Sequence, residues 1–298
     1  MHEANSRIED PNWPFARLRG SDGRAVGWSL VHGPVVTAHH HERLAALRRD
    51  GERFVGMTSY MRFPSATGDH PLDYAMLCEA WCHCFRAPDA HLPAGQPRAL
   101  LSLSDFCDPQ RIARERIAAP EEHFDVVYVG TDEAWKREAK NWPLAARCIP
   151  RMTREFGWRA LVVGTPSAEF PPTPGVCFVA QLPWRELLGR IAGARLLFVP
   201  NGEDASPRVI AEALCLDVPI VVNRRILGGW KYVNAFTGAF FDTEDDLLPA
   251  VSALAPLGPL AWFRANHGPY LAGQRLLALI RRLDPALAEP SHLAVDGA

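Results

Sequence analysis

The chain has 298 residues, of which 48% are hydrophobic and 22% charged, and its formal net charge is −2. Chains of this length usually divide into two cores, and a nearly neutral charge excludes a broad basic surface for nucleic acid. No apolar run reaches the roughly 20 residues of a membrane-spanning helix, and the polar start MHEANSRIEDPN lacks the apolar core of a signal peptide. We therefore expect a cytoplasmic protein without a membrane span.

The seven cysteines are odd in number and lie mostly within apolar segments, which favours reduced, buried thiols. The cluster CEAWCHC at 78–84 raises the alternative of a zinc site. However, Cys78 and Cys82 have helical spacing, and no second CxxC pair is present to complete four ligands. A packed helix face is the favoured interpretation, and we predict no metal site.

Residues 1–24 are polar and rich in Pro, Arg and Gly, which predicts a loose arm. The pattern that follows predicts a small Rossmann-like domain over 25–122. Its expected elements are strands at 25–31, 53–60 and 98–104 and helices at 37–51 and 71–86. The charged segment 111–123 contains a proline and is the candidate linker or linking helix.

A more regular alternation fills residues 123–257. Strands are expected at 125–130, 159–165, 175–180, 196–200 and 219–223, and helices at 134–156, 183–194 and 207–216. This alternation is typical of a parallel sheet covered on both faces, whose ligands bind beyond the carboxyl ends of the strands. The tail predicts a helical segment at 258–288, with an amphipathic helix that packs back on the body, and a frayed end at 289–298.

The segment NGEDASPRVIAEALCLDVPIVV (201–222) places Asp204 and Glu212 eight residues apart. Ser206 is a suitable helix N-cap and Pro207 suits the first turn, so the free amides of this helix favour a phosphate group. Arg208 adds a positive charge, and Glu212 lies one turn further on the same face, about 5–6 Å away. The distance between Arg208 and Glu212 is similar to the distance between the diphosphate and the ribose of a nucleotide. The alternative is a solvated ion pair between Arg208 and Glu212, worth little to stability.

With its flanks, FVPNGEDASPRVIAEALCLDVPIVV resembles the C-terminal domain of the group-1, or family 4, glycosyltransferases of the GT-B fold. VYVGTDEAWKREAKNW resembles the phosphate-binding strand and loop of that family, with Lys140 and Asn141 in the place of its Lys-Gly or Lys-Asn. LGGWKYVNAFTGAFFDTEDDLLPAV resembles its Gly-rich loop, Thr-Gly turn and the start of the helix that follows. The resemblance spans about 124–253 and implies an α/β protein with two Rossmann-like domains whose parallel sheets face a cleft.

Three residues depart from the family pattern. Asp204 replaces a Glu, which shortens the reach toward the transferred sugar. Thr131 stands in place of an Arg, so that a diphosphate contact must come from elsewhere, with Lys136, Arg137 and Arg208 as candidates. Asp217 occupies a Gly position with a left-handed backbone.

The resemblance implies a glycosyltransferase that moves a sugar from a nucleoside-diphosphate sugar to a glycan, lipid or other hydroxyl acceptor, with retention and without a metal or other cofactor. Charge grows on the departing diphosphate during such a reaction, so groups that stabilise it are the expected catalysts. The expected catalytic residues are Asp204, Lys140, Arg208 and Asp105. The expected donor-binding residues are Glu212, Ser206, Pro207, Val209, Gly130, Thr131, Leu182 and Gly229.

The N-terminal domain is expected to bind the acceptor with residues that follow its strands. The candidates on this side are His32, Gly33, Ser59 and Ser104, and Asp105 is a plausible base. The alternatives are a catalytically silent protein that binds nucleotide sugars, a GT-B nucleotide-sugar epimerase, and a sugar-phosphate synthase. The sequence leaves the sugar, the base, the acceptor and the oligomeric state open.

Overall fold

The computed structural model describes residues 12–65, 72–115, 122–254, 258–287 and 290–296. The chain forms two compact units. Unit 1 combines Met1–Leu103 with Pro269–Ala298, and unit 2 is the continuous stretch Ser104–Gly268. The predicted boundary near residue 122 is therefore about twenty residues too late, and the C-terminal helical segment is shared between the units.

Unit 1 is built on one sheet of six strands in the order β12-β1-β2-β3-β4-β5. Strands β2 to β5 are parallel, whereas β1 pairs antiparallel with both β2 and β12. The strands are β1 (Phe15–Gly20), β2 (Ala25–Val31), β3 (Arg53–Met57), β4 (Ala80–His83), β5 (Arg98–Leu100) and β12 (Leu293–Val295). The helices are α1 (Ala38–Arg49), α2 (Tyr74–Leu77), α10 (Pro269–Arg281) and the short 3-10 turn η1 (Pro88–Ala90).

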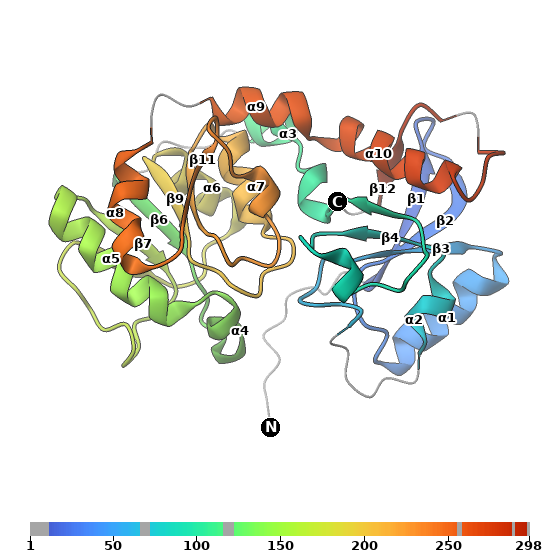
Figure 1. Ribbon diagram of the computed structural model, residues 1–298, viewed down its shortest axis with the longest axis horizontal. Helices are drawn as coiled ribbons and strands as arrows, with labels where there is room; N and C mark the ends of the chain where they lie inside the picture. The colour runs from blue at the N-terminus through green and yellow to red at the C-terminus, as the bar shows by residue number, and fades with distance from the viewer. Residues whose placement is uncertain (1–11, 66–71, 116–121, 255–257, 288–289, 297–298) are drawn as a thin grey trace. The chain divides into compact units, whose positions relative to one another are not determined.

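The helix α10 packs against β12, β4 and β5, so the expectation that a C-terminal helix packs back on the body is confirmed. Figure 1 shows α10 on one side of the unit 1 sheet and α1 with α2 on the other. Close packing is visible at Gly273, where an added Cβ would lie 2.1 Å from the carbonyl oxygen of Leu293.

Three predictions for this part of the chain are wrong. The loose arm contains β1 and the frayed end contains β12, and these two strands pair with each other. The helix expected at 71–86 is a single turn, α2, followed by β4. The free cysteines Cys78, Cys82 and Cys84 are therefore buried in and beside a strand and do not form a helix face.

Unit 2 contains a sheet of six parallel strands in the order β11-β10-β9-β6-β7-β8. The strands are β6 (Val126–Val129), β7 (Ala160–Val163), β8 (Val176–Val179), β9 (Leu196–Val199), β10 (Ile220–Asn223) and β11 (Gly238–Phe241). Chain order runs outward from β6 to β8 on one side and from β9 to β11 on the other. This is a doubly wound Rossmann-like order, as predicted.

The helices of unit 2 cover both faces of this sheet. They are α3 (Pro109–Arg114), α4 (Ala134–Ala139), α5 (Trp142–Phe156), α6 (Trp184–Ala192), α7 (Arg208–Cys215), α8 (Glu244–Ser252) and α9 (Pro259–Asn266), with the 3-10 turns η2 (Leu103–Phe106) and η3 (Trp230–Tyr232). Successive strand residues alternate between two cores, as the two-residue period of a strand requires. Val127 and Leu197 pack with α6, α7 and α9, whereas Val126 and Phe198 pack with α5 and α8.

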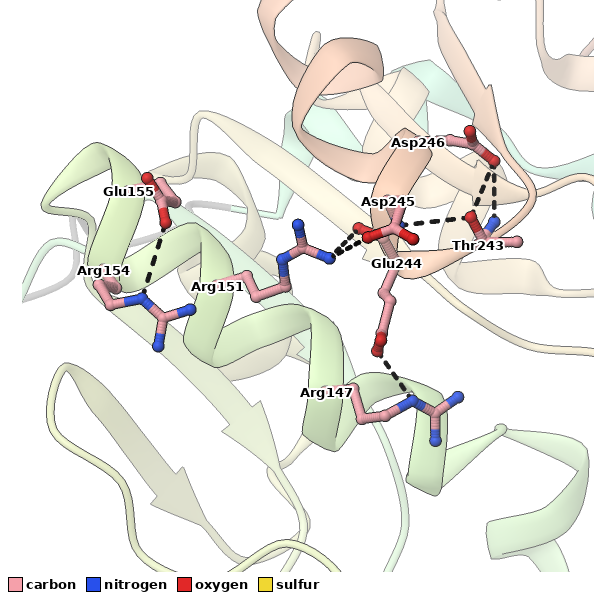
Figure 2. Close-up of polar contacts among 8 residues, drawn as sticks. All are labelled: Arg147, Arg151, Arg154, Glu155, Thr243, Glu244, Asp245 and Asp246. Carbon is pink, nitrogen blue, oxygen red and sulfur yellow. Dashed lines mark hydrogen bonds and ion pairs between the residues drawn. The ribbon is translucent and has the colours of Figure 1, made fainter.

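The contact between α5 and α8 is reinforced at the surface. Figure 2 shows Arg147 and Arg151 of α5 reaching the first turn of α8, where they pair with Glu244 at 2.9 Å and Asp245 at 2.9 Å. At the same helix start, Thr243 and Asp246 form a capping box, in which each side chain accepts from the other's backbone N–H. The cap and the ion pairs together fix where α8 begins.

Candidate donor-binding site

The strand order of unit 2 reverses between β6 and β9. In such sheets the loops that follow these two strands diverge and leave a binding position at their carboxyl ends. The loop after β6 begins with Gly130 and Thr131, and the loop after β9 contains Asn201 and Asp204. Most of the predicted donor residues lie in these two loops and in the helices that follow them.

Gly130 lies where no larger residue fits. A Cβ at this position would lie 2.5 Å from Trp142 Cζ3 and 2.9 Å from the carbonyl oxygen of Val163. Thr131 follows, and its hydroxyl accepts from the backbone N–H of Glu133 at 3.1 Å. Thr131 thus stabilises a turn within this loop.

The predicted helix at 134–156 is two helices, α4 and α5, separated by Lys140 and Asn141. Asn141 has a left-handed backbone (φ 52°, ψ 53°), which explains why Gly or Asn suits this position. Its side chain donates to the carbonyl oxygen of Pro200 at 3.1 Å and so ties the break to the end of β9. Lys140 Nζ lies 2.7 Å from Asp204 Oδ2, and the Asn201 amide donates to the same oxygen at 2.8 Å. The structure therefore brings Lys140 and Asp204 together across 64 residues of sequence.

The start of α7 differs from the prediction in one respect. Ser206 is not the N-cap, because the helix is preceded by Pro207 and receives no side-chain cap. The Ser206 hydroxyl instead lies 2.7 Å from the hydroxyl of Ser104, whose backbone N–H donates to it at 3.2 Å. Gly229 (φ 80°) packs on Pro207, and a Cβ at that glycine would lie 2.6 Å from Pro207 Cγ.

Glu212 lies inside α7 and is only 5% exposed. Its Oε1 accepts from the indole N–H of Trp184 at 2.8 Å, and within the described part of the chain Oε2 accepts no hydrogen bond. Burial raises the pKa of Glu212, although the Trp184 hydrogen bond and the charge of Arg208 act in the opposite direction. Glu212 is therefore not the solvated member of an ion pair.

Arg208 is exposed at the first position of α7, and it makes no ion pair within 4 Å with any residue that the structure describes. The other two candidates for a diphosphate contact are engaged. Lys136 pairs with Glu133 at 2.5 Å, and the Arg137 guanidinium lies 5.3 Å from the centre of the Trp142 ring. Arg208 is thus the cation best placed for a phosphate at this helix start.

Two further donor-side candidates are half-buried. Leu182 lies in the loop between β8 and α6, two residues before Trp184. Val209 packs at the edge of the core that includes Ile210. Asp217 has φ 61°, as predicted, and its carboxylate accepts from the backbone N–H of Leu260 at 3.0 Å.

The assignment of Ser104 and Asp105 to the acceptor domain is wrong, because both belong to unit 2. Asp105 is 0% exposed and accepts hydrogen bonds from Lys231 and, at 2.8 Å, from Tyr232, while His267 Nδ1 lies 2.8 Å from its Oδ1. A carboxylate with no exposed surface and three such partners cannot accept a proton from an acceptor hydroxyl. Asp105 therefore has no part in the mechanism proposed below.

The remaining acceptor-side candidates lie in unit 1 at the carboxyl ends of its parallel strands. The backbone N–H of His32 donates to Pro14 at 3.0 Å, and Gly33 packs so closely on Trp13 that a Cβ would lie 2.7 Å from its ring. The Ser59 hydroxyl accepts from the backbone N–H of Leu103 at 3.5 Å. The three residues follow β2 and β3 and share one edge of the sheet.

Two residues near the site received no contact of their own in the sequence analysis: Trp184 and Asn201. Asn201 donates to the carboxylate of Asp204, and Trp184 donates to that of Glu212. Trp184 lies 28 residues before Glu212 in the sequence. A Trp at the start of a helix after a strand gives no signal of its own until the partner Glu212 is known. The motif can be found in the sequence, but the contact between Trp184 and Glu212 becomes visible only in the folded chain.

Among the described residues, no group of three His, Cys, Asp or Glu side chains is arranged to hold a metal ion. In the same part of the chain, no helix has the length and apolar character needed to cross a membrane.

No family model and no curated protein matches this sequence. Solved structures do match. The trehalose-6-phosphate synthase from Burkholderia multivorans has 15% identity and a TM-score of 0.59, with 87% of this chain and 72% of that chain covered. The sucrose-phosphate synthase from Thermosynechococcus elongatus has 17% identity and a TM-score of 0.54, with 83% and 72% covered.

A third similar structure is the UDP-forming trehalose-phosphate synthase from Burkholderia xenovorans in complex with glucose-6-phosphate. It has 13% identity and a TM-score of 0.57, with 84% of this chain and 72% of that chain covered. The chain thus has the two-domain GT-B fold of these glycosyltransferases. The predicted resemblance is confirmed at the level of the fold.

Proposed function

We propose that this protein is a glycosyltransferase that uses a nucleoside-diphosphate sugar as donor and a hydroxyl group as acceptor. The observation that carries the proposal is the convergence at the β6–β9 reversal of a Lys140–Asp204 pair with the start of α7 and Glu212. The similar structures support it, since one is of a UDP-forming synthase with a sugar phosphate bound. A UDP-sugar donor is accordingly the first choice for this chain.

Glu212 is the proposed ribose ligand. Its Oε1 is held by Trp184, while Oε2 is available to accept from a ribose hydroxyl. A carboxylate with one oxygen already fixed loses little freedom on binding, which favours a well-defined pose.

The diphosphate is proposed to lie against the first turn of α7. Backbone N–H groups at a helix start carry partial positive charge, and Arg208 adds a full charge beside them. Lys140 is the second proposed cation. Its ammonium group pairs with Asp204, and the negative charge of a diphosphate would compete for that group.

Asp204 is proposed to face the transferred sugar. In the reaction the bond between the anomeric carbon and the diphosphate oxygen breaks, a bond to the acceptor oxygen forms, and the proton of the acceptor hydroxyl passes to the departing diphosphate. The diphosphate gains negative charge as it leaves, so Lys140, Arg208 and the α7 amides stabilise the transition state more than the ground state. Retention of configuration and independence from metal ions are part of the proposal.

The acceptor is proposed to bind at the carboxyl-end edge of the unit 1 sheet, near His32, Gly33 and Ser59. Glycan, lipid and sugar-phosphate hydroxyl groups are all compatible with the residues there.

The proposal is tested by incubating the purified protein with UDP-, GDP- and ADP-sugars and measuring release of nucleoside diphosphate. Slow release without acceptor, abolished by Asp204→Asn, is expected from a transferase. Binding without any release would favour a silent nucleotide-sugar-binding protein, and interconversion of the sugar without release would favour an epimerase.

A further inference from the structure

Four buried polar side chains of unit 2 have no part in the proposed reaction: Asp105, Lys231, Tyr232 and His267. We name them the Asp105 cluster. The Asp105 carboxylate accepts from Lys231 Nζ and from the Tyr232 hydroxyl at 2.8 Å, and His267 Nδ1 lies 2.8 Å from its Oδ1. The side chains of Lys231 and His267 are 7% and 8% exposed, so the whole group is almost removed from water.

Stability alone does not account for this cluster. Burial by itself raises the pKa of Asp105, but Lys231 and His267 outweigh burial and hold the pKa below its ordinary value, so the carboxylate is charged at neutral pH. Removing an ion pair from water costs free energy that the pair only about recovers, and apolar side chains would often serve as well. What a charged, hydrogen-bonded group adds is a fixed orientation of the segments that carry it.

Three separate segments meet at Asp105. Asp105 itself lies in η2 at the beginning of unit 2, and Lys231 and Tyr232 form η3 in the loop after β10. At the end of unit 2, His267 follows α9, and the backbone N–H of Gly268 donates to the Asp105 carbonyl oxygen at 3.0 Å. A single residue thus joins the beginning, the end and one loop of the unit.

Two of these segments continue into the candidate donor site. Ser104, next to Asp105, holds the hydroxyl of Ser206 just before α7. On the other side, the backbone N–H of Gly228 donates to the carbonyl oxygen of Asp204 at 2.9 Å. The loop that leads into α7 is therefore held from two sides by segments that Asp105 joins.

We propose that Asp105 is a positioning residue of the donor site, which fixes the Gly228–Tyr232 loop and Ser104 so that Asp204 and the start of α7 keep the geometry that a diphosphate needs. This inference rests on the proposed function. Asp105 touches no substrate and acts through the residues that it holds.

The test uses Asp105→Asn, which preserves the shape of the side chain but removes its charge. Asp125→Asn is the matched control. Asp125 is also a paired carboxylate of unit 2, with Arg195 at 2.6 Å, but it directly precedes β6 and lies at the amino end of the sheet.

Binding of UDP, GDP and ADP, and of their nucleosides, is measured by calorimetry. We expect Asp105→Asn to raise the Kd of the best-bound diphosphate at least tenfold and that of its nucleoside less than twofold. Asp125→Asn is expected to change both by less than twofold. An equal loss in the two variants would overturn the inference, because it would reflect general loosening of unit 2.

Hydrogen exchange of the protein without nucleotide provides a second readout. Amide exchange in 201–208 and 227–233 should rise in Asp105→Asn and stay unchanged in Asp125→Asn; unchanged exchange in both segments would overturn the inference. If the wild type binds none of the three nucleotides, the proposed function fails, while these exchange data still decide the positioning role. If Asp105→Asn does not fold, the double variant Asp105→Asn with Lys231→Met also removes the buried ammonium charge, and it replaces the single variant in both measurements.

Discussion

At the scale of single residues, Glu212 combines two properties that rarely occur together. It is almost fully buried, yet one of its oxygens is held by Trp184 and the other accepts nothing from the described residues. Burial of this carboxylate raises its pKa and makes its charged form costly to the folded state. The proposed ribose-binding role would account for a carboxylate at this position.

We predict that Glu212→Gln weakens nucleoside-diphosphate binding at least tenfold while the melting temperature stays the same or rises. The reason is the raised pKa of Glu212: the folded protein binds the proton more readily than the unfolded chain, so stability falls as pH rises above the ordinary Glu pKa of about 4.3. The amide variant lacks this loss at neutral pH. Calorimetry and thermal melts between pH 4 and 8, chosen to span that range, measure both effects. A large drop in melting temperature with binding intact would show that Glu212 is structural.

Arg208 is predicted to act on the phosphates alone. Arg208→Ala should weaken UDP binding about tenfold, the order expected when a charge-assisted hydrogen bond is lost, and leave uridine binding nearly unchanged. Arg154→Ala is the control, because Arg154 is an exposed residue at the end of α5 whose neighbour is Glu155. Equal losses for UDP and uridine would contradict a phosphate role.

Local signals in the sequence sufficed for some residues of the site and not for others. The left-handed position of Asp217 could be anticipated from the family pattern, whereas the break at Lys140–Asn141 was missed, because 134–156 was predicted as one helix. The burial of Asp105 could not, because its partners Lys231, Tyr232 and His267 are more than 120 residues away. An aspartate after a strand is equally suited to a turn, a cap or a base, and only tertiary contacts distinguish these.

At the scale of elements, whether a strand was predicted correctly depends on which elements surround it. In unit 2 every predicted strand is found, because short β-branched runs that alternate with helices are typical of buried parallel strands. β4 was predicted as a helix because CEAWCHC has apolar residues at both helical and strand spacings. Its true state depends on β3 and β5, between which it lies, and neither neighbour is visible in the local pattern.

Helix α8 offers a comparison between a cap and a surface ion pair (Figure 2). Thr243→Ala should reduce the free energy of unfolding by about 1 kcal/mol, since it removes a helix N-cap. Arg147→Ala should reduce it by at most about 0.5 kcal/mol, because the pair with Glu244 is half exposed. Urea unfolding at low and high salt measures both, and only the Arg147 effect should shrink with salt. An Arg147 effect larger than that of Thr243 would contradict this ranking.

At the scale of the whole molecule, unit 1 is discontinuous in sequence, and its sheet is completed by the last strand. Leu293 and Val295 of β12 are buried, and β12 covers the edge of β1. Both strands lie in segments that the sequence analysis assigned to loose ends. Their short length and polar surroundings gave no periodic signal, and their pairing joins segments that are far apart in the sequence.

Removal of residues 290–298 is therefore predicted to loosen unit 1 selectively. Hydrogen exchange should increase in β1 and β2, while exchange in β6 and β9 of unit 2 remains as in the intact protein. Asp296→Ala is the matched control, because it removes only the ion pair with Arg19 at 2.7 Å. Equal exchange in the truncated and intact proteins would show that β12 contributes little.

The late position of β12 also bears on how the chain acquires its structure during translation. Domains fold as the chain emerges from its N-terminal end, and unit 2 is a continuous stretch whose residues all leave the ribosome before β12 does. Until then, β1 presents an unpaired edge that other nascent chains could join. The β1 edge of unit 1 is accordingly the last part of its sheet to be covered during synthesis.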